Sequence, residues 1–322
     1  MNVMSKYIWM NGKLEEYEKA TLHFLTPALH YGVGVFEGIR AYATADGPAV
    51  FRLKEHIHRL VQSAQILGFR DLPYTEEELA NAVRITVAVN GFENCYIRPL
   101  IYLDDGGWNL SVDNGKAAVG IAVWEWNNYL GPEALEKGIR ANIASFTRHH
   151  PNVMMTKAKI TGNYANSVLA KTESMRLGFD EAIMLDPQGY VAECTGENIF
   201  LVRNNKVYTT PSAEILEGIT RDTIKVICRD LGFEVIEQPI SRDQLYIADE
   251  VFVSGTAAEC IALTEIDFRI IGSGRMGPVT RAIQSTFHNA IRGLNPHSKE
   301  WLDYVRIPAD ELLTISQEQT LK

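Results

Sequence analysis

The sequence predicts a protein of the α+β class with two domains. Strand patterns, short runs rich in β-branched and aromatic residues, occur in both halves of the chain, with a few amphipathic helix patterns between them. A length of 322 residues is typical of two domains. The segment 127–137 mixes Asn, Gly and Pro after a strand pattern, so we place a linker there. The smaller domain is then 1–126 and the larger one 138–322.

Local patterns predict the individual elements. Asn11-Gly12 predicts a hairpin within 7–17, because this dipeptide favours the left-handed backbone of a tight turn. In the first domain, helical spacing predicts helices over 54–67 and 76–89, and strands are expected at 96–103 and 117–124. In the second domain we expect helices over 163–177, 219–231 and 279–291, and strands at 139–144, 181–185, 197–202, 206–209 and 250–254.

The composition excludes several classes of function. A net charge of -9 argues against a nucleic-acid or anionic-membrane partner, since both favour a basic surface. The four cysteines are far apart and form no zinc or disulfide pattern, so we expect no metal and free thiols in a reducing compartment. The start of the chain does not resemble a signal peptide, and no apolar run approaches the roughly 20 residues of a membrane span. We therefore expect a cytoplasmic protein.

The first candidate for chemistry is a pair of lysines just before a predicted helix. Lys157 and Lys159 precede a helix that opens near Asn163. The N-terminal end of a helix is partially positive, so a partly buried lysine there is deprotonated more easily and becomes a nucleophile toward carbonyl groups. Two exposed surface lysines are the alternative. Spacing alone does not choose between these interpretations, nor between the two lysines.

Two acidic residues and two turns follow in the second half. Glu193 and Glu197 flank the end of a strand, where a buried carboxylate needs a cationic partner. That partner is either a protonated ring nitrogen or an arginine elsewhere in the chain. The segments 216–221 and 252–258 each form a glycine-containing turn with hydroxyl groups, beside a helix start and a strand end respectively. Such turns bind phosphate or carboxylate oxygens, although many ordinary turns have this composition.

The first half contributes arginines among aromatic residues. Arg40 follows a run of glycines and aromatics that indicates close backbone packing. Tyr96 and Arg98 lie on one side of a predicted strand, so Arg98 is either part of a structural ion pair or a reader of anions. Arg59, on the first predicted helix, is by default a solvated surface residue.

In their order and spacing, these motifs closely resemble those of the branched-chain amino acid aminotransferases, within the fold-type IV pyridoxal-phosphate (PLP) enzymes. The resemblance runs from Tyr7 to about Arg281. It is carried by LHYGVGVFEGIRAY, FRLKEHIHRL, YIRPL, KITGNY, AECTGENIF, LEGITRD, LYIADEVFVSGTAAE and GRMGPVT. It implies two α/β domains of the D-amino acid aminotransferase type, with the cofactor at the domain interface.

The resemblance also implies roles for individual residues toward PLP. The Schiff-base lysine of the family precedes Gly-Asn-Tyr by three residues, which selects Lys159 over Lys157. Glu193 matches the acid that faces the pyridine nitrogen, and Tyr164 matches the tyrosine that binds the phenolic oxygen. Arg59 matches the phosphate-binding arginine, which reverses its default interpretation. The remaining expected cofactor contacts are Gly218, Ile219, Thr220, Ser254 and Thr256.

For substrates, the resemblance implies a ping-pong transamination between a branched-chain L-amino acid and 2-oxoglutarate. Tyr96 and Arg98 match the pair that helps the pocket accept both a branched side chain and a distal carboxylate, and Arg40 is expected beside them. The other expected substrate residues are Phe36, Trp126, Tyr129, Ala257 and Ala258, with Tyr31 reaching in from a neighbouring subunit, so at least a homodimer is implied.

Two features bear on substrate choice. The loop 104–111 reads DDGGWNLS and departs from the short Gly-Val-Asn-type loop usual in the family. It resembles the loop that lines the pocket from the partner subunit, so its tryptophan and two acids are candidates for determining which side chains or carboxylates are accepted. An (R)-amine or D-amino acid transaminase of the same fold is the alternative activity. The YIRPL motif favours the branched-chain type.

Overall fold

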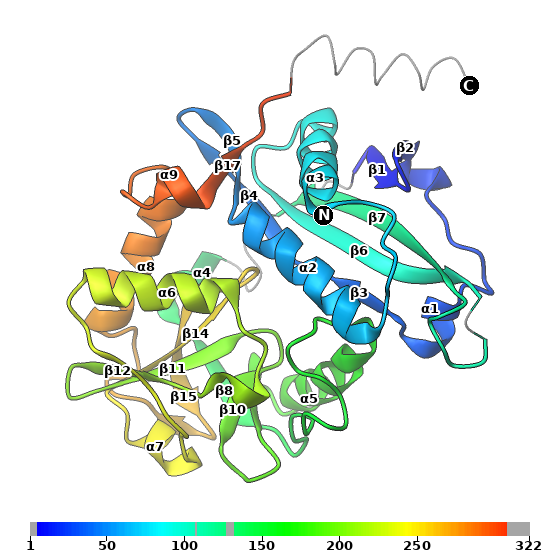
Figure 1. Cartoon of the computed structure of the whole chain (residues 1–322). Coiled ribbons are helices and arrows are strands. Elements are labelled where there is room, and N and C mark those ends of the chain that lie inside the picture. The colour runs from blue at the N-terminus through cyan, green and yellow to red at the C-terminus, as the bar shows by residue number, and fades with distance from the viewer. Residues whose placement is uncertain (1–4, 107, 127–131, 308–322) are drawn as a thin grey trace. The chain divides into compact units, whose positions relative to one another are not determined.

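The computed structural model describes residues 5–106, 108–126 and 132–307 (Figure 1). The chain forms two compact units. Unit 1 comprises 1–127, 158–162 and 290–322, and unit 2 comprises 128–157 and 163–289. The division expected from sequence cuts the chain once, at a linker over 127–137. Unit 1 instead also includes 158–162, which interrupts unit 2 in the sequence, and the chain from 290 onward.

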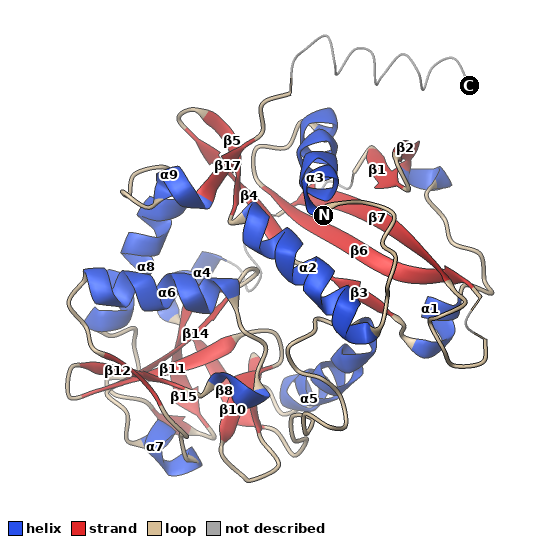
Figure 2. Ribbon diagram, viewed as in Figure 1, coloured by secondary structure: helices blue, strands red, loops and turns tan. Residues whose placement is uncertain are grey.

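Unit 1 is built on a sheet that has eight strands within the described residues, in the order β17-β5-β4-β6-β7-β1-β2, with β3 paired to β6 (Figure 2). Its strands are β1 (Tyr7–Met10), β2 (Lys13–Glu16), β3 (Gly34–Phe36), β4 (Ile39–Thr44), β5 (Gly47–Phe51), β6 (Cys95–Asp105), β7 (Lys116–Glu125) and β17 (Leu302–Tyr304). The helices are η1 (Tyr17–Lys19), α1 (Pro27–Tyr31), α2 (Leu53–Leu67), α3 (Glu76–Asn90) and α9 (Ser298–Trp301). Apolar residues of α2 and α3, such as Ile57, Leu60 and Val83, are fully buried in one core with those of the strands.

Unit 2 contains a second sheet, nine-stranded within the described residues, in the order β10-β9-β8-β15-β14-β11-β12-β13, with β16 on β15. The strands are β8 (Ile139–Ile143), β9 (Glu181–Leu185), β10 (Val191–Cys194), β11 (Asn198–Arg203), β12 (Lys206–Thr209), β13 (Val235–Glu237), β14 (Glu250–Gly255), β15 (Glu259–Ile266) and β16 (Arg269–Ile270). The helical elements are α4 (Pro132–Lys137), η2 (Thr161–Asn163), α5 (Tyr164–Arg176), η3 (Ser212–Glu214), α6 (Ile219–Asp230), α7 (Arg242–Tyr246) and α8 (Pro278–Ile291), with η2 crossing from unit 1 into unit 2.

The structure confirms the elements expected from local patterns to within one or two residues. In the turn between β1 and β2, Asn11 has φ 49° and Gly12 φ 90°, the left-handed pair that Asn-Gly predicts. Helix α3 begins at a capping box in which Thr75 and Glu78 bond each other's backbone N–H groups. The expected linker is partly helical, since 132–137 forms α4, and its residues 127–131 lie outside the described part.

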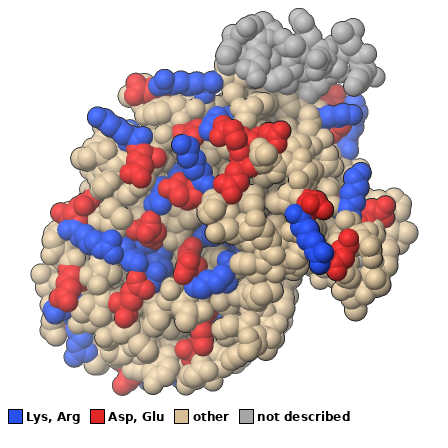
Figure 3. Space-filling model, viewed as in Figure 1, with Lys and Arg blue, Asp and Glu red and all other residues tan. Residues whose placement is uncertain are grey.

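Three general properties bear on function. All four cysteines are buried and free. Burial raises the pKa of the Cys95 and Cys228 thiols to about 12, so neither is a reactive thiolate at neutral pH. Within the described residues, no helix is both long and apolar enough to cross a membrane. On the face drawn in Figure 3, basic and acidic side chains alternate and neither sign forms a large continuous patch.

Candidate active site

Lys159 lies in the short segment of unit 1 that interrupts unit 2. Its backbone is fixed on both sides, because its N–H donates to Ser63 Oγ at 3.0 Å and its carbonyl accepts from the N–H of Phe36 at 3.0 Å. The Nζ atom lies 5.0 Å from the centre of the Phe36 ring. A backbone held in this way directs the amine to one place, as a covalent attachment point requires.

Close backbone packing fixes the end of the same segment. Gly162 N–H donates to the carbonyl of Gly32, and Thr161 Oγ1 donates to the same oxygen at 2.6 Å. A Cβ on Gly32 would lie 2.8 Å from Gly162 Cα, so no other residue fits there. The glycines near Tyr31 therefore serve the close packing that the sequence indicated.

Lys157 has a different environment, although it is only two residues away. It belongs to unit 2. Its Nζ donates to the carbonyl of Ser212 and forms a 3.0 Å ion pair with Glu217. The Lys157 contact lowers the pKa of the Glu217 carboxyl. Lys157 thus has a structural role as the ion-pair partner of Glu217.

Arg59 is not the solvated surface residue that its helix position suggested by default. Its guanidinium forms a bidentate ion pair with Glu37, with Nε–Oε1 2.6 Å and Nη2–Oε2 2.9 Å. His56, one turn earlier on α2, contacts the same carboxylate through Nδ1 at 2.8 Å. The side chain of Arg59 is only 12% exposed, so its charge is held in a largely enclosed place.

Arg98 lies among aromatic rings. Its guanidinium carbon is 4.6 Å from the centre of the Phe36 ring and 5.4 Å from that of Tyr96. Its Nη2 donates to Tyr96 Oη at 3.4 Å, which confirms that both side chains lie on one side of β6. Within the described residues it forms no ion pair, and its buried Nε atom has no hydrogen-bond partner. The sequence left two interpretations of Arg98 open, and an arginine that binds an anionic ligand group fits this environment better than a member of a structural ion pair.

Arg40 is the strand neighbour of Tyr96, since the two are paired across β4 and β6. The side chain is buried, stacks over Tyr42 with 4.6 Å to the ring centre, and donates to the carbonyl of Trp126 at 3.3 Å. The rings of Tyr96 and Trp126 are 5.1 Å apart. Unit 1 therefore brings together an aromatic and cationic group of expected substrate residues.

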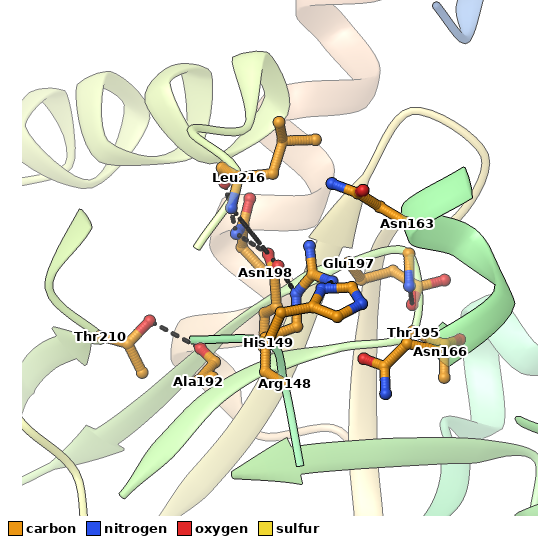
Figure 4. A network of polar contacts seen from close by, with 12 residues as sticks. Arg148, His149, Asn163, Asn166, Ala192, Thr195, Glu197, Asn198, Thr210 and Leu216 are labelled. Carbon is orange, nitrogen blue, oxygen red and sulfur yellow. Dashed lines mark hydrogen bonds and ion pairs between the residues drawn. The ribbon is translucent and has the colours of Figure 1, made fainter. Parts of the chain in front are cut away.

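In unit 2, Glu193 at the end of β10 is surrounded by hydrogen-bond donors. Arg148 Nε contacts Oε1 at 2.7 Å, Asn198 Nδ2 contacts Oε2 at 3.1 Å, and the N–H of Leu216 lies 3.2 Å from Oε2. Figure 4 shows Arg148, Asn198 and Leu216 within this network. Glu193 thus has the arginine partner that the sequence left open. A carboxylate has about four acceptor sites, so it can still take a further donor such as a protonated ring nitrogen.

His149 extends this network through Arg148. Its Nδ1 lies 2.8 Å from Arg148 Nη1. Burial, and then the charge of Arg148, lower the pKa of His149 to about 4. The imidazole is therefore neutral at pH 7, and its Nδ1 accepts the hydrogen bond that Arg148 donates.

Helix α6 supplies a place for an anion in the same unit. Gly218 is its N-cap, and no described side chain caps the first turn. The N-terminal N–H groups of a helix have no partner within the helix and attract anions. A Cβ on Gly218 would lie 2.0 Å from Asn198 Oδ1, so glycine is required. Ser254 on β14 is buried, and its Oγ has no partner among the described residues. A phosphate group fits both observations.

The other expected residues are distributed as follows. Tyr164 is the first residue of α5 and is half-buried, and the turn after β14 leaves Thr256 and Ala257 half-exposed and Ala258 buried. Tyr31 is 43% exposed at the end of α1, and its ring lies 5.8 Å from that of Trp108 in the unusual loop 104–111. Tyr129 lies outside the described residues.

The expected site residues thus form two groups. Unit 1 holds Tyr31, Phe36, Arg40, Arg59, Tyr96, Arg98, Trp126 and Lys159, and unit 2 holds Tyr164, Glu193, Gly218, Ile219, Thr220, Ser254, Thr256, Ala257 and Ala258. Five further residues that contact members of these groups were not singled out from the sequence: Glu37, His56, Arg148, Asn198 and Leu216. One signal was available for Glu37, because an acid between Phe36 and Gly38 in an apolar run needs a buried partner.

Comparison with known proteins now identifies the family. The family profile "Amino-transferase class IV" matches residues 34–266. The chain belongs to the class IV aminotransferases, and the expectation of a fold-type IV aminotransferase is confirmed.

Individual relatives are more specific. The chain is 46% identical to the branched-chain-amino-acid aminotransferase of Pseudomonas aeruginosa, over 93% of this chain and 97% of that protein. It also resembles the crystal structure of the Escherichia coli branched-chain amino acid aminotransferase, with a TM-score of 0.91 and 44% identity over 94% of this chain and 100% of that one. A T.th. branched-chain amino acid aminotransferase complexed with N-(5'-phosphopyridoxyl)-L-glutamate has a TM-score of 0.89 and 46% identity, with the same coverage of both chains.

Proposed function

We propose that this protein is a PLP-dependent aminotransferase that moves an amino group between a branched-chain L-amino acid (leucine, isoleucine or valine) and 2-oxoglutarate. The observation that carries the proposal is the environment of Arg98. A cation among the rings of Phe36, Tyr96 and Trp124 suits a pocket that takes an apolar side chain in one half-reaction and a distal carboxylate in the other. The names of the relatives support the same activity.

PLP supplies an electron sink that stabilises the negative charge left when the α-proton is removed. In our proposal Lys159 would hold it covalently and Tyr164 would donate to its phenolic oxygen. Glu193 would accept a hydrogen bond from the pyridine nitrogen and keep that nitrogen protonated. Arg59, the Gly218–Thr220 turn, Ser254 and Thr256 would bind the phosphate.

The amine of Lys159 then has a second task. With the amino acid joined to the cofactor in place of Lys159, the freed Nζ would take the α-proton as a general base and, as a general acid, would deliver it to the C4′ carbon of PLP. Ala257 and Ala258, beside Thr256, receive the α-carboxylate. Water would then release the first oxo acid and leave the amino group with the cofactor. The second oxo acid would take up that amino group by the reverse route, so the two substrates would use the site in turn.

A substrate panel tests the proposal. We expect amino transfer from L-leucine to 2-oxoglutarate and from L-glutamate to a branched-chain oxo acid. We expect little transfer from D-alanine or (R)-1-phenylethylamine. The names of the relatives do not favour the (R)-amine and D-amino acid alternatives. Preferred use of either of those two donors would overturn the proposed substrate class while leaving aminotransferase activity intact.

Arg98→Ala and Arg40→Ala are each expected to impair the dicarboxylate half-reaction selectively. A charge-assisted contact to the distal carboxylate contributes about 1.5–3 kcal/mol, which corresponds to a loss of roughly ten- to a hundredfold in kcat/KM for glutamate. Leucine has no such group, so its half-reaction should change much less. Single-turnover kinetics with each amino acid measures both effects. An equal loss for leucine and glutamate would mean that these arginines are structural, and the loop 104–111 would then be the next candidate for substrate choice.

We also propose that the protein is at least a homodimer. Large apolar residues are exposed around α1, and we call them the α1 patch: Leu22, Phe24, Leu25, Leu29, Tyr31, Trp108 and Leu110. The ring of His30, beside the patch residues Leu29 and Tyr31, lies 5.2 Å from the ring of Trp108 and 5.6 Å from that of Phe24, so the chain segments that carry these residues lie together. Exposed apolar patches mark interaction sites. In a dimer this patch brings Tyr31 and Trp108 to the partner's substrate pocket.

Leu29→Asp should therefore weaken self-association, because it places a charge in the patch. Leu29 is 64% exposed, and Leu294, 72% exposed in the same unit but outside the patch, provides the matched control Leu294→Asp. Sedimentation equilibrium measures the mass of each variant. A monomeric wild type, or unchanged association of Leu29→Asp, contradicts the proposal.

We also propose that the protein is located in the cytoplasm. The four buried free thiols support this location, and cell fractionation tests it.

A further inference from the structure

Glu37 is a carboxylate with no exposed surface, located between β3 and β4. It makes two contacts with Arg59 and one with His56, and its Oε2 also accepts from the N–H of Gly38 at 3.2 Å. His56 and Arg59 are three residues apart on α2, so both face the same side of the helix. The carboxylate is therefore held from several directions, and Arg59 is held by it.

The protonation states within this cluster follow from its charges. Burial alone would raise the pKa of Glu37, but the charge of Arg59 and the hydrogen bonds from His56 and Arg59 outweigh it, so the pKa lies well below its usual value. Burial lowers the pKa of His56, opposed by Glu37 and assisted by Arg59 and Lys159. His56 is accordingly neutral, and its Nδ1–H donates to Glu37, since an ionised carboxylate only accepts. The cluster contains one anion and one cation.

We propose that Glu37, supported by His56, is a positioning residue that orients Arg59 toward the phosphate group of PLP. This inference rests on the proposed function, in which Arg59 binds that phosphate. Glu37 engages the Nε and Nη2 edge of the guanidinium. Because the guanidinium is a planar fork, its Nη1 side is then directed away from the carboxylate, and this is the side that meets the phosphate.

Two effects oppose each other when Glu37 is neutralised. The negative charge of Glu37 repels a phosphate, so its removal increases the attraction of the site for anions. Its removal also takes away the bidentate contact that orients the long Arg59 side chain, which is 12% exposed. We expect the loss of orientation to be larger, because the carboxylate charge is already balanced by Arg59, whereas a glutamine amide has a single acceptor oxygen and cannot reproduce the bidentate geometry.

The test compares the affinity of the apo-protein for PLP and for pyridoxal, which lacks the phosphate. Glu37→Gln is expected to weaken PLP binding by about ten- to a hundredfold, the range seen when the residue that supports a ligand-binding side chain is lost at metal sites. Pyridoxal binding should change little. The matched control is Asp303→Asn, since Asp303 forms the same kind of bidentate pair with Arg84 in unit 1, with Nε–Oδ1 2.7 Å and Nη2–Oδ2 2.8 Å. This control should leave both affinities unchanged.

The outcomes separate this inference from the proposed function. If Arg59→Ala leaves the preference for PLP over pyridoxal unchanged, Arg59 does not bind the phosphate and that part of the proposed function fails. The second outcome is that Arg59→Ala reduces the preference for PLP over pyridoxal, whereas Glu37→Gln leaves it unchanged or increases it. In that case only the positioning role is overturned. An equal loss for both ligands in Glu37→Gln indicates a structural role and also overturns it. Should Glu37→Gln fail to fold, His56→Ala takes its place, with a smaller fall in the same preference expected, while His56→Asn, which retains a donor near the Nδ1 position, should keep it.

Discussion

Lys159→Ala is expected to abolish both the visible absorbance of bound PLP and all transamination, whereas Lys157→Ala should leave both nearly unchanged. The Nζ of Lys159 is the proposed covalent attachment point and the group that moves the α-proton, so its removal eliminates two functions at once. Absorbance spectra of the purified variants, followed by single-turnover kinetics with leucine, measure both effects.

The structure explains why two lysines so close in sequence should differ. The Lys159 backbone is fixed by Ser63 and Phe36, and its Nζ lies 5.0 Å from the centre of the Phe36 ring. The amine of Lys157 is occupied by Glu217 and the carbonyl of Ser212. Loss of this partly exposed ion pair costs at most about 1 kcal/mol. If the Lys157 variant is the colourless one, the assignment of the two lysines is reversed.

Much of the fold could be predicted from the sequence because its signals are local. The Asn11-Gly12 turn, the capping box at Thr75 and the apolar spacing of α2 each depend on a few neighbouring residues. Which chain segments make up each of the two units could not be predicted in this way. Strand β17 pairs with β5, with Leu302 opposite Phe51, and such a long-range pairing has no local signature.

The candidate site shows the same limit. The family resemblance pointed to Lys159 and Glu193, but a helix pattern alone placed Arg59 on the surface. Its ion pair with Glu37 joins residues 22 positions apart. Arg148 was missed for a similar reason, because its contact with Glu193 spans 45 positions. Residues that support a functional side chain through tertiary contacts become visible only once the fold brings them together.

Glu193→Gln is the second variant for which we expect a large effect. It should still bind PLP but lose kcat by at least about a hundredfold, as when a single preorganised electrostatic group is removed from an active site. A neutral amide does not keep the pyridine nitrogen protonated, and an unprotonated ring stabilises the negative charge at the α-carbon poorly. Cofactor titration and single-turnover rates with leucine and with glutamate separate binding from chemistry, and both half-reactions should slow alike.

The control is Glu197→Gln, four residues further along the chain. Glu197 is also buried, and its carboxylate accepts from the N–H of Gly196 at 3.1 Å, whereas Glu193 is the acid that accepts from Arg148 Nε. We expect a milder effect from Glu197→Gln, because the charge beside Arg148 and Asn198 is retained.

Glu193→Gln also removes the anionic partner of the buried Arg148, and breaking such a pair typically costs about 3–5 kcal/mol of folding stability. The thermal midpoint of each variant must therefore be measured beside its rate. A slow Glu193→Gln enzyme that is fully folded and loaded with PLP supports the electronic role, whereas equal losses in the two variants mean that the roles are shared or wrongly assigned.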